Sequence, residues 1–269
     1  MKKLFVLIAA ACMTCTAAFA QTVKPFKEGE RAVFLGNSIT DGGHYHSYIW
    51  LYYMTRFPDM PIRVFNGGIG GDTAYDMNKR LDGDIFAMKP SVLMVTFGMN
   101  DSGYFEYNGD KPKEFGEQKY QESVKNYQQM EKRFKDLPDT RIVMVGTSPY
   151  DETVQLKENT PFKTKNETIK RLVEYQKESA AKNNWEFTDL NAPMTAINQQ
   201  YQQKDPTFTL CGSDRIHPDN DGHMVMAYLF LKAQGFVGKE VADMEINANK
   251  KQAVKSENCT VSNLSLIHI

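Results

Sequence analysis

Ser38 lies where a serine can do chemistry, directly after the apolar run Ala32–Leu35 and shortly before a helical segment. The run is typical of a buried strand, and Gly36 and Asn37 lead the chain out of it. Backbone N–H groups at the start of a helix point outward, and the helix dipole favours negative charge there. Ser38 is therefore a candidate nucleophile, although Gly36-Asn37-Ser38 also has the composition of an ordinary turn.

A serine becomes nucleophilic when a neighbouring base takes its proton. His217 is the candidate base, and Asp214 precedes it in the segment Asp214-Arg215-Ile216-His217. An aspartate at this spacing can fold back within one turn, fix the tautomer of the imidazole and stabilise its protonated form. A surface Asp-His pair near the start of a helix would show the same pattern, so that alternative stays open at this point.

Acyl transfer also needs hydrogen-bond donors that are already in place for the oxyanion. Three candidates are the backbone N–H of Ser38, the backbone N–H of Gly71 and the side-chain amide of Asn100. A turn that needs positive φ would explain Gly71 equally well, and a cap or Asx-turn would explain Asn100. Four residues near these groups are expected to contact the substrate: Asn37, Tyr45, His46 and Asp101.

Strands and helices alternate along the chain. Strands are predicted at 32–35, 62–65, 91–97, 141–146 and 185–190, and helices at 44–57, 74–88, 117–137, 161–184, 192–203 and 223–234. This alternation predicts a three-layer α/β/α sandwich with a central parallel sheet. Ligands bind such sheets at the carboxyl ends of the strands. Because Ser38, Gly71 and Asn100 follow the first three strands, they should converge on one rim.

Four blocks of this sequence resemble the SGNH hydrolases, also called the GDSL-like lipase/esterase family. The blocks are Gly36-Asn37-Ser38-Ile39, Gly70-Gly71-Asp72-Thr73, Gly98-Met99-Asn100-Asp101 and Asp214-x-x-His217, in the family's order. The resemblance covers roughly residues 31–234.

The resemblance to this family implies a Ser38-His217-Asp214 triad, an oxyanion hole from Ser38, Gly71 and Asn100, and no cofactor. Asn37 departs from the eponymous pattern, which has Asp at this position. Thr40 stands where the α/β-hydrolase elbow Gly-x-Ser-x-Gly has its second glycine, which argues against the α/β-hydrolase fold.

These features predict an exported serine esterase that hydrolyses carboxylic esters, with an acetyl group on a small molecule or polysaccharide as the expected substrate. The loops at 102–116 and 147–165 are polar, which favours a sugar over a lipid. The alternatives are a lipase, lysophospholipase or thioesterase of the same family, and a non-catalytic carbohydrate-binding module on the same fold. The sequence does not indicate the oligomeric state.

The chain has 269 residues, 41% of them hydrophobic, and a formal net charge of −1. One domain is expected over residues 21–240, with neither nucleic acid nor an anionic membrane surface as partner. After the N-terminus no apolar run is long enough to span a bilayer. His44 and His46 form a His-x-His pair whose rings would point to different faces, and no third ligand is evident, so no metal site is expected.

Both ends of the chain carry segments that stand apart from the predicted domain. Met1-Lys2-Lys3, the apolar stretch after it and Ala18-Phe19-Ala20 predict a signal peptide over 1–20, so the mature protein would be periplasmic or secreted. The segment Leu264–Ile269 matches the translated end of a transposase adapter used in sequencing libraries and is predicted to be non-native. Residues 241–263 are then predicted to begin a further, truncated C-terminal region. Whether Cys211 and Cys259 pair stays open.

Overall fold

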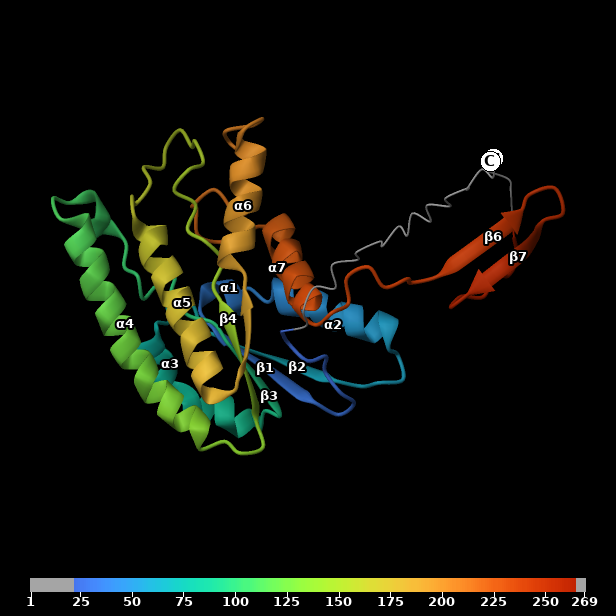
Figure 1. The fold of residues 1–269 in the computed structure, drawn as a ribbon, viewed down its shortest axis with the longest axis horizontal. Coiled ribbons are helices and arrows are strands. Elements are labelled where there is room, and N and C mark those ends of the chain that lie inside the picture. Colours follow the sequence, from blue (N-terminus) through green and yellow to red (C-terminus); the bar gives the residue numbers. More distant parts are fainter. Residues whose placement is uncertain (1–21, 265–269) are drawn as a thin grey trace, which may run out of the picture.

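A computed structural model describes residues 22–264, so the predicted signal peptide and residues 265–269 lie outside the described part of the chain. The centre of the fold is a parallel five-stranded sheet in the order β2-β1-β3-β4-β5 (Figure 1). Its strands are β1 Arg31–Gly36, β2 Arg63–Gly68, β3 Val92–Val95, β4 Arg141–Gly146 and β5 Glu186–Asp189. The predicted α/β/α sandwich with a parallel sheet is confirmed.

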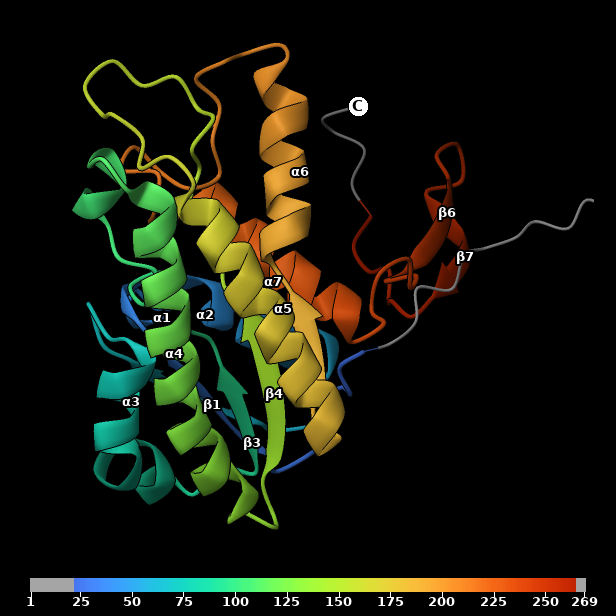
Figure 2. The ribbon, with the colours of Figure 1, turned by 60° about the vertical axis from the view of Figure 1, so that its left-hand side comes forward.

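Helices cover both faces of the sheet. They are α1 Ser38–Asp41, α2 His44–Arg56, α3 Ala74–Arg80, α4 Pro112–Lys135, α5 Lys165–Asn183, α6 Asn191–Gln202 and α7 Asn220–Ala233. Helices α2 and α7 lie on one face of the sheet, and α3 and α4 lie on the other (Figures 1 and 2). Alternate side chains of β1 enter two cores: Phe34 packs with α2 and α7, and Leu35 packs with α3 and α4. This period of two is what a strand buried on both faces requires.

The bounds of two predicted helices differ by five residues or more in the structure. The helix expected over 74–88 ends at Arg80 and continues as a π-turn at Leu81–Ile85 and a 3₁₀ turn at Phe86–Met88. Gly83 and two aspartates in this stretch are weak helix formers, which fits the change of helix type. α4 begins at Pro112 rather than at 117, because proline suits the first position of a helix.

A small antiparallel hairpin follows the main domain. β6 Asp243–Asn247 pairs with β7 Gln252–Glu257 and stands apart from the large sheet (Figure 1). That 241–263 begins a further region stays a prediction. Cys211 is buried and, like Cys259, carries a free thiol. Between residues 22 and 264, no helix combines the length and the apolar character needed to cross a membrane.

The short helix α1 lies directly against β2, and Gly68 makes this approach possible. A Cβ atom at Gly68 would lie 2.2 Å from the backbone nitrogen of Asp41. The neighbouring Asn66 side chain donates a hydrogen bond of 2.9 Å to the carbonyl of Asp41 and accepts one of 2.9 Å from the N–H of Gly68. The first turn after β1, which contains Ser38, is therefore held at a fixed height above the sheet.

We predict that Gly68→Ala lowers the free energy of unfolding by about 1–3 kcal/mol, because the new methyl group overlaps backbone atoms that cannot rotate away. Gly83→Ala is the matched control: no atom lies within 4 Å of a Cβ built there, and its expected effect is within about 0.5 kcal/mol. Urea unfolding of both variants checks this. An unchanged midpoint for Gly68→Ala would contradict it.

Candidate functional site

Ser38 is the first residue of α1, which begins two residues after β1 ends. The side chain of Asn37 caps the helix by accepting a hydrogen bond of 3.1 Å from the backbone N–H of Ile39. At such a helix start the first N–H groups have no acceptor within the helix. The N–H of Ser38 donates to no acceptor among residues 22–264 and so remains available.

Ser38, His217 and Asp214 form a hydrogen-bonded chain. Ser38 Oγ lies 2.7 Å from His217 Nε2, and His217 Nδ1 lies 2.5 Å from Asp214 Oδ2. The second carboxylate oxygen of Asp214 accepts 2.9 Å hydrogen bonds from the backbone N–H groups of Ile216 and His217. If Nδ1 carries the proton, Nε2 is free to accept from the serine hydroxyl. The imidazole and the carboxylate are about half exposed, so a substrate can reach them.

The Asp214–His217 pair changes the pKa of each partner. The hydrogen bond between the His217 ring and Asp214 raises the pKa of His217 above its usual value of 6.5. Partial burial of the ring opposes this rise but is the smaller effect. Burial alone would raise the pKa of Asp214, but the hydrogen bonds from the ring and the two backbone N–H groups outweigh it, so that pKa is lowered. Asp214 therefore stays ionised and favours the protonated imidazole.

Arg215 anchors the loop that carries this pair, and sequence reasoning missed it. Arg215 has φ +69° and is almost fully buried. Its guanidinium donates to the carbonyls of Asp151, Val154 and Asn159 at 3.1, 2.7 and 2.6 Å. The carbonyl of Arg215 in turn accepts from the N–H of Asp151 at 3.1 Å. A charged residue in a polar loop gives no sequence signal of burial, so this anchor becomes visible only in the fold.

The other two predicted donors lie on neighbouring loops. Gly71 has φ +84°, and within residues 22–264 its N–H has no hydrogen-bond acceptor. Asn100 donates a hydrogen bond of 2.9 Å from Nδ2 to the carbonyl of Asp72, the residue after Gly71. The structure thus links the Gly71 loop to the Asn100 turn, as the shared rim predicted.

A buried carboxylate holds these two loops together. Asp101 accepts hydrogen bonds from the N–H of Ala74 at the start of α3, from the N–H of Gly98 after β3, and from the hydroxyl of Ser123 in α4, at 2.9, 2.9 and 3.0 Å. Burial raises its pKa while the three donors oppose that rise. Asp72, which follows Gly71, forms a 2.6 Å ion pair with Arg80 and so connects the Gly71 loop to α3.

Asn37, Tyr45, His46 and Asp101, which are predicted to contact the substrate, lie inside the protein, and that contact stays a prediction. All four side chains are buried. Tyr45 exchanges a 3.0 Å hydrogen bond with the hydroxyl of Thr40, and His46 Nε2 lies 3.2 Å from the carbonyl of Thr40. Their closeness to Ser38 in the sequence did not reveal that α2 turns the Tyr45 and His46 side chains inward. Tyr45 and His46 thus contact α1, through Thr40, from the buried side.

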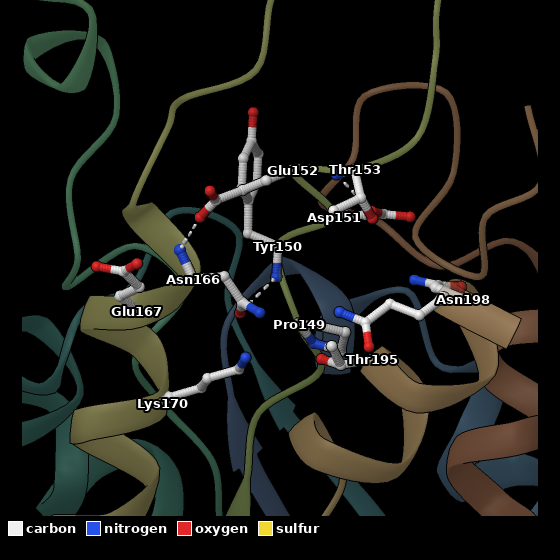
Figure 3. A pocket seen from close by; sticks show the side chains of 11 residues that line it. Pro149, Tyr150, Asp151, Glu152, Thr153, Asn166, Glu167, Lys170, Thr195 and Asn198 are labelled. Atoms are coloured by element: carbon white, nitrogen blue, oxygen red, sulfur yellow. Dashed lines mark hydrogen bonds between the residues drawn. The ribbon is translucent and has the colours of Figure 1, made fainter. Parts of the chain in front are cut away.

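Two polar hollows flank the loop that carries His217. One, of about 470 Å³, is lined by His44, Pro218, Asp219, Asn220, Asp221 and His223. The other, of about 150 Å³, lies between the end of β4 and helices α5 and α6 (Figure 3). Asn166 spans this second hollow, since its Oδ1 accepts a 3.2 Å hydrogen bond from the N–H of Tyr150 (Figure 3). Neither Ser38 nor His217 lines it.

Residues 34–225 match the GDSL-like Lipase/Acylhydrolase family. Together with the fold and the ordered blocks, this match shows that the chain belongs to that family of serine ester hydrolases. The predicted family is confirmed.

Similar proteins extend this picture. The chain is 27% identical over 224 residues to an acetylxylan esterase of Geobacillus stearothermophilus, covering 77% of this chain and 95% of that protein. The solved structure of an acetylxylan esterase from that organism gives a TM-score of 0.61 at 25% identity, over 78% of this chain and 96% of that one. A solved gut microbial diltiazem-metabolizing enzyme is 84% identical, with a TM-score of 0.86 over 90% of this chain. The chain spans 55% of the length of that enzyme.

We predict that Asp101→Asn lowers both the free energy of unfolding, by about 1–3 kcal/mol, and kcat, because the new amide NH₂ must face one of the three donors. Asp59→Asn, at an exposed turn residue, is the control and should change neither. Urea unfolding and ester hydrolysis, measured on the same samples, test this. Equal stability and turnover in the two variants would show that Asp101 does not hold the loops together.

Proposed function

We propose that this protein is an acetyl esterase that works through an acyl-enzyme on Ser38. The observation that carries the proposal is the hydrogen-bonded chain from Ser38 Oγ through His217 to Asp214, with distances of 2.7 and 2.5 Å. In the first step His217 Nε2 takes the hydroxyl proton while Oγ attacks the carbonyl carbon of the ester. The Asp214 carboxylate stabilises the imidazolium that forms.

The carbonyl oxygen then becomes an oxyanion. The N–H of Ser38, the N–H of Gly71 and the second amide N–H of Asn100 are the donors that we assign to it. Collapse of the intermediate expels the alcohol, which receives the proton from His217. Water, with its proton taken by the same imidazole, hydrolyses the acyl-enzyme and restores Ser38. No cofactor enters this cycle.

We propose an acetylated carbohydrate as the substrate class. The acetylxylan esterase similarity supports this, and so does the polar hollow beside His217, where Asp219, Asn220 and Asp221 offer acceptors for sugar hydroxyls. An acetate ester of an aromatic small molecule is the second candidate. Its support is the similarity to the diltiazem-metabolizing enzyme and the exposed Phe105, 80% accessible, whose ring packs edge-on against Phe162 at 5.5 Å.

We further propose that the protein is exported, on the strength of the basic, apolar and Ala18-Phe19-Ala20 segments at its N-terminus. Those residues lie outside the described part of the chain. A periplasmic or secreted esterase would meet acetylated glycans directly, so the two proposals are consistent with each other.

We predict that the mature protein hydrolyses p-nitrophenyl acetate faster than p-nitrophenyl octanoate, and that Ser38→Ala lowers kcat by about 10⁶-fold. Ser47→Ala is the matched control, because Ser47 lies on the exposed side of α2 and bonds only the carbonyl of Gly43. A fluorophosphonate probe should label the wild type and Ser47→Ala but not Ser38→Ala.

The outcomes of this assay separate the alternatives. Faster turnover of the long-chain ester would favour a lipase, and equal rates for wild type and Ser38→Ala would favour a non-catalytic carbohydrate-binding module. Parallel assays with acetylated xylo-oligosaccharide and with diltiazem, each followed by acetate release, then decide between the sugar ester and the ester of an aromatic small molecule.

We predict a pH dependence set by His217. The base works only when neutral, so kcat/KM should fall as the pH drops through the raised pKa of His217, with an apparent pKa above 6.5. Asp214→Asn removes the group that raises this pKa, so the acid limb should move to lower pH while the plateau falls by about 10³–10⁴-fold. A pH–rate profile with an unmoved acid limb in Asp214→Asn would contradict the pairing.

A further inference from the structure

The amide of Asn100 is held by two different partners. Its Oδ1 accepts a hydrogen bond of 2.5 Å from the hydroxyl of Tyr104, and its Nδ2 donates one of 2.9 Å to the carbonyl of Asp72. Rotating the amide by half a turn would set its oxygen against the Asp72 carbonyl, so this pair of contacts selects one orientation. One N–H of Asn100 is left over, without an acceptor among the described residues.

The turn that carries Asn100 is bound from beneath by a buried lysine. Lys165, the first residue of α5, has no exposed surface. Its Nζ donates to the carbonyl of Met99, the hydroxyl of Ser102 and the carbonyl of Gly103, at 2.7, 2.6 and 2.5 Å. These three acceptors lie on either side of Asn100 in the sequence, so one ammonium group fixes both ends of the turn.

Lys165 also lies below Tyr104, with Nζ 3.9 Å from the centroid of the phenol ring. The charged groups that act on it are Asp101 and Glu152, and within residues 22–264 neither forms an ion pair with it. Burial lowers the pKa of Lys165 to about 7. Placing an ammonium group in the interior is costly unless its hydrogen bonds are satisfied, and here all its acceptors belong to the Asn100 turn.

We propose that Tyr104 and Lys165 are positioning residues for the oxyanion donor Asn100. Tyr104 sets the orientation of the amide, and Lys165 holds the 99–103 turn and the ring of Tyr104. This inference rests on the proposed function, because it requires that Asn100 stabilises the oxyanion. Donors fixed before the reaction cost no reorganisation when charge develops, so the effect should appear in kcat rather than in KM.

Tyr104→Phe tests the first part, because it removes the hydroxyl and keeps the ring over Lys165. We expect kcat for p-nitrophenyl acetate to fall about 10–100-fold, with KM within about two-fold and the melting temperature close to that of the wild type. In an Asn100→Ala background the same change should lower kcat less than about two-fold, because the group that it positions is gone.

Tyr150→Phe is the matched control. Tyr150 belongs to the same aromatic cluster, but its hydroxyl accepts a hydrogen bond from the N–H of Phe162 at 2.9 Å rather than contacting the Asn100 turn. It should lower stability and leave kcat within about two-fold of wild type. A similar loss of kcat in Tyr150→Phe and Tyr104→Phe, or an undiminished effect of Tyr104→Phe in the Asn100→Ala background, would overturn the proposal.

Lys165→Met tests the second part and should lower kcat at unchanged KM. If this variant does not fold, Ser102→Ala replaces it, since it removes one acceptor of Lys165 and leaves the core filled. Unchanged kcat in whichever of the two variants folds would overturn the role of Lys165. Ser38→Ala and Asn100→Ala are measured as controls in the same experiment. If both lose activity while Tyr104→Phe does not, only this inference fails. An active Ser38→Ala would contradict the proposed function itself.

Discussion

The geometry of the site depends on the hydrogen bonds that the buried Asp101 carboxylate accepts. This carboxylate joins the end of β3, in the sheet, to α3 and α4, two neighbouring helices of the layer that covers one face of that sheet. Hydrogen bonds to a charged acceptor in a low dielectric are strong and short-ranged, so they fix distances better than apolar packing does. These hydrogen bonds hold the loops that carry Gly71 and Asn100 at a fixed separation. The Asn100–Asp72 hydrogen bond depends on this separation.

The loop that carries Asp214 and His217 is held in place by a different interaction. Asp214 and His217 lie on an exposed loop, and their geometry is fixed by the buried guanidinium of Arg215 between them. Because three of the acceptors of Arg215 are backbone carbonyls, with the side-chain oxygen of Asn159 as a fourth at 3.4 Å, the loop is fastened mainly to the backbone that follows β4. One buried anion and one buried cation thus organise the two sides of Ser38.

The sequence was sufficient for the sheet, the family and the three residues of the hydrogen-bonded chain. Apolar runs that end in Gly, Asn or Ser indicate strand ends, and the parallel sheet brings those ends to one rim. The sequence did not indicate which side chains near that rim are buried. Tyr45, His46 and Asp101 have side chains common on surfaces, and only the packing of α2 and α3 decides that they point inward. Lys165 and Arg215 were missed for the same reason, since cations are rarely buried.

The contact between Gly68 and α1 has a consequence for how such an enzyme can change over time. The height of Ser38 above the sheet is set where backbone atoms of Gly68 meet backbone atoms of α1, and the Asn66 side chain bonds the same backbone. Exposed residues around the rim, such as Phe105 and Asp219, take no part in that contact. Residues of the rim can therefore mutate while Ser38 stays in place. A scaffold of this kind separates its chemistry from its selectivity, and laboratory selection for new esters should find its gains at the rim.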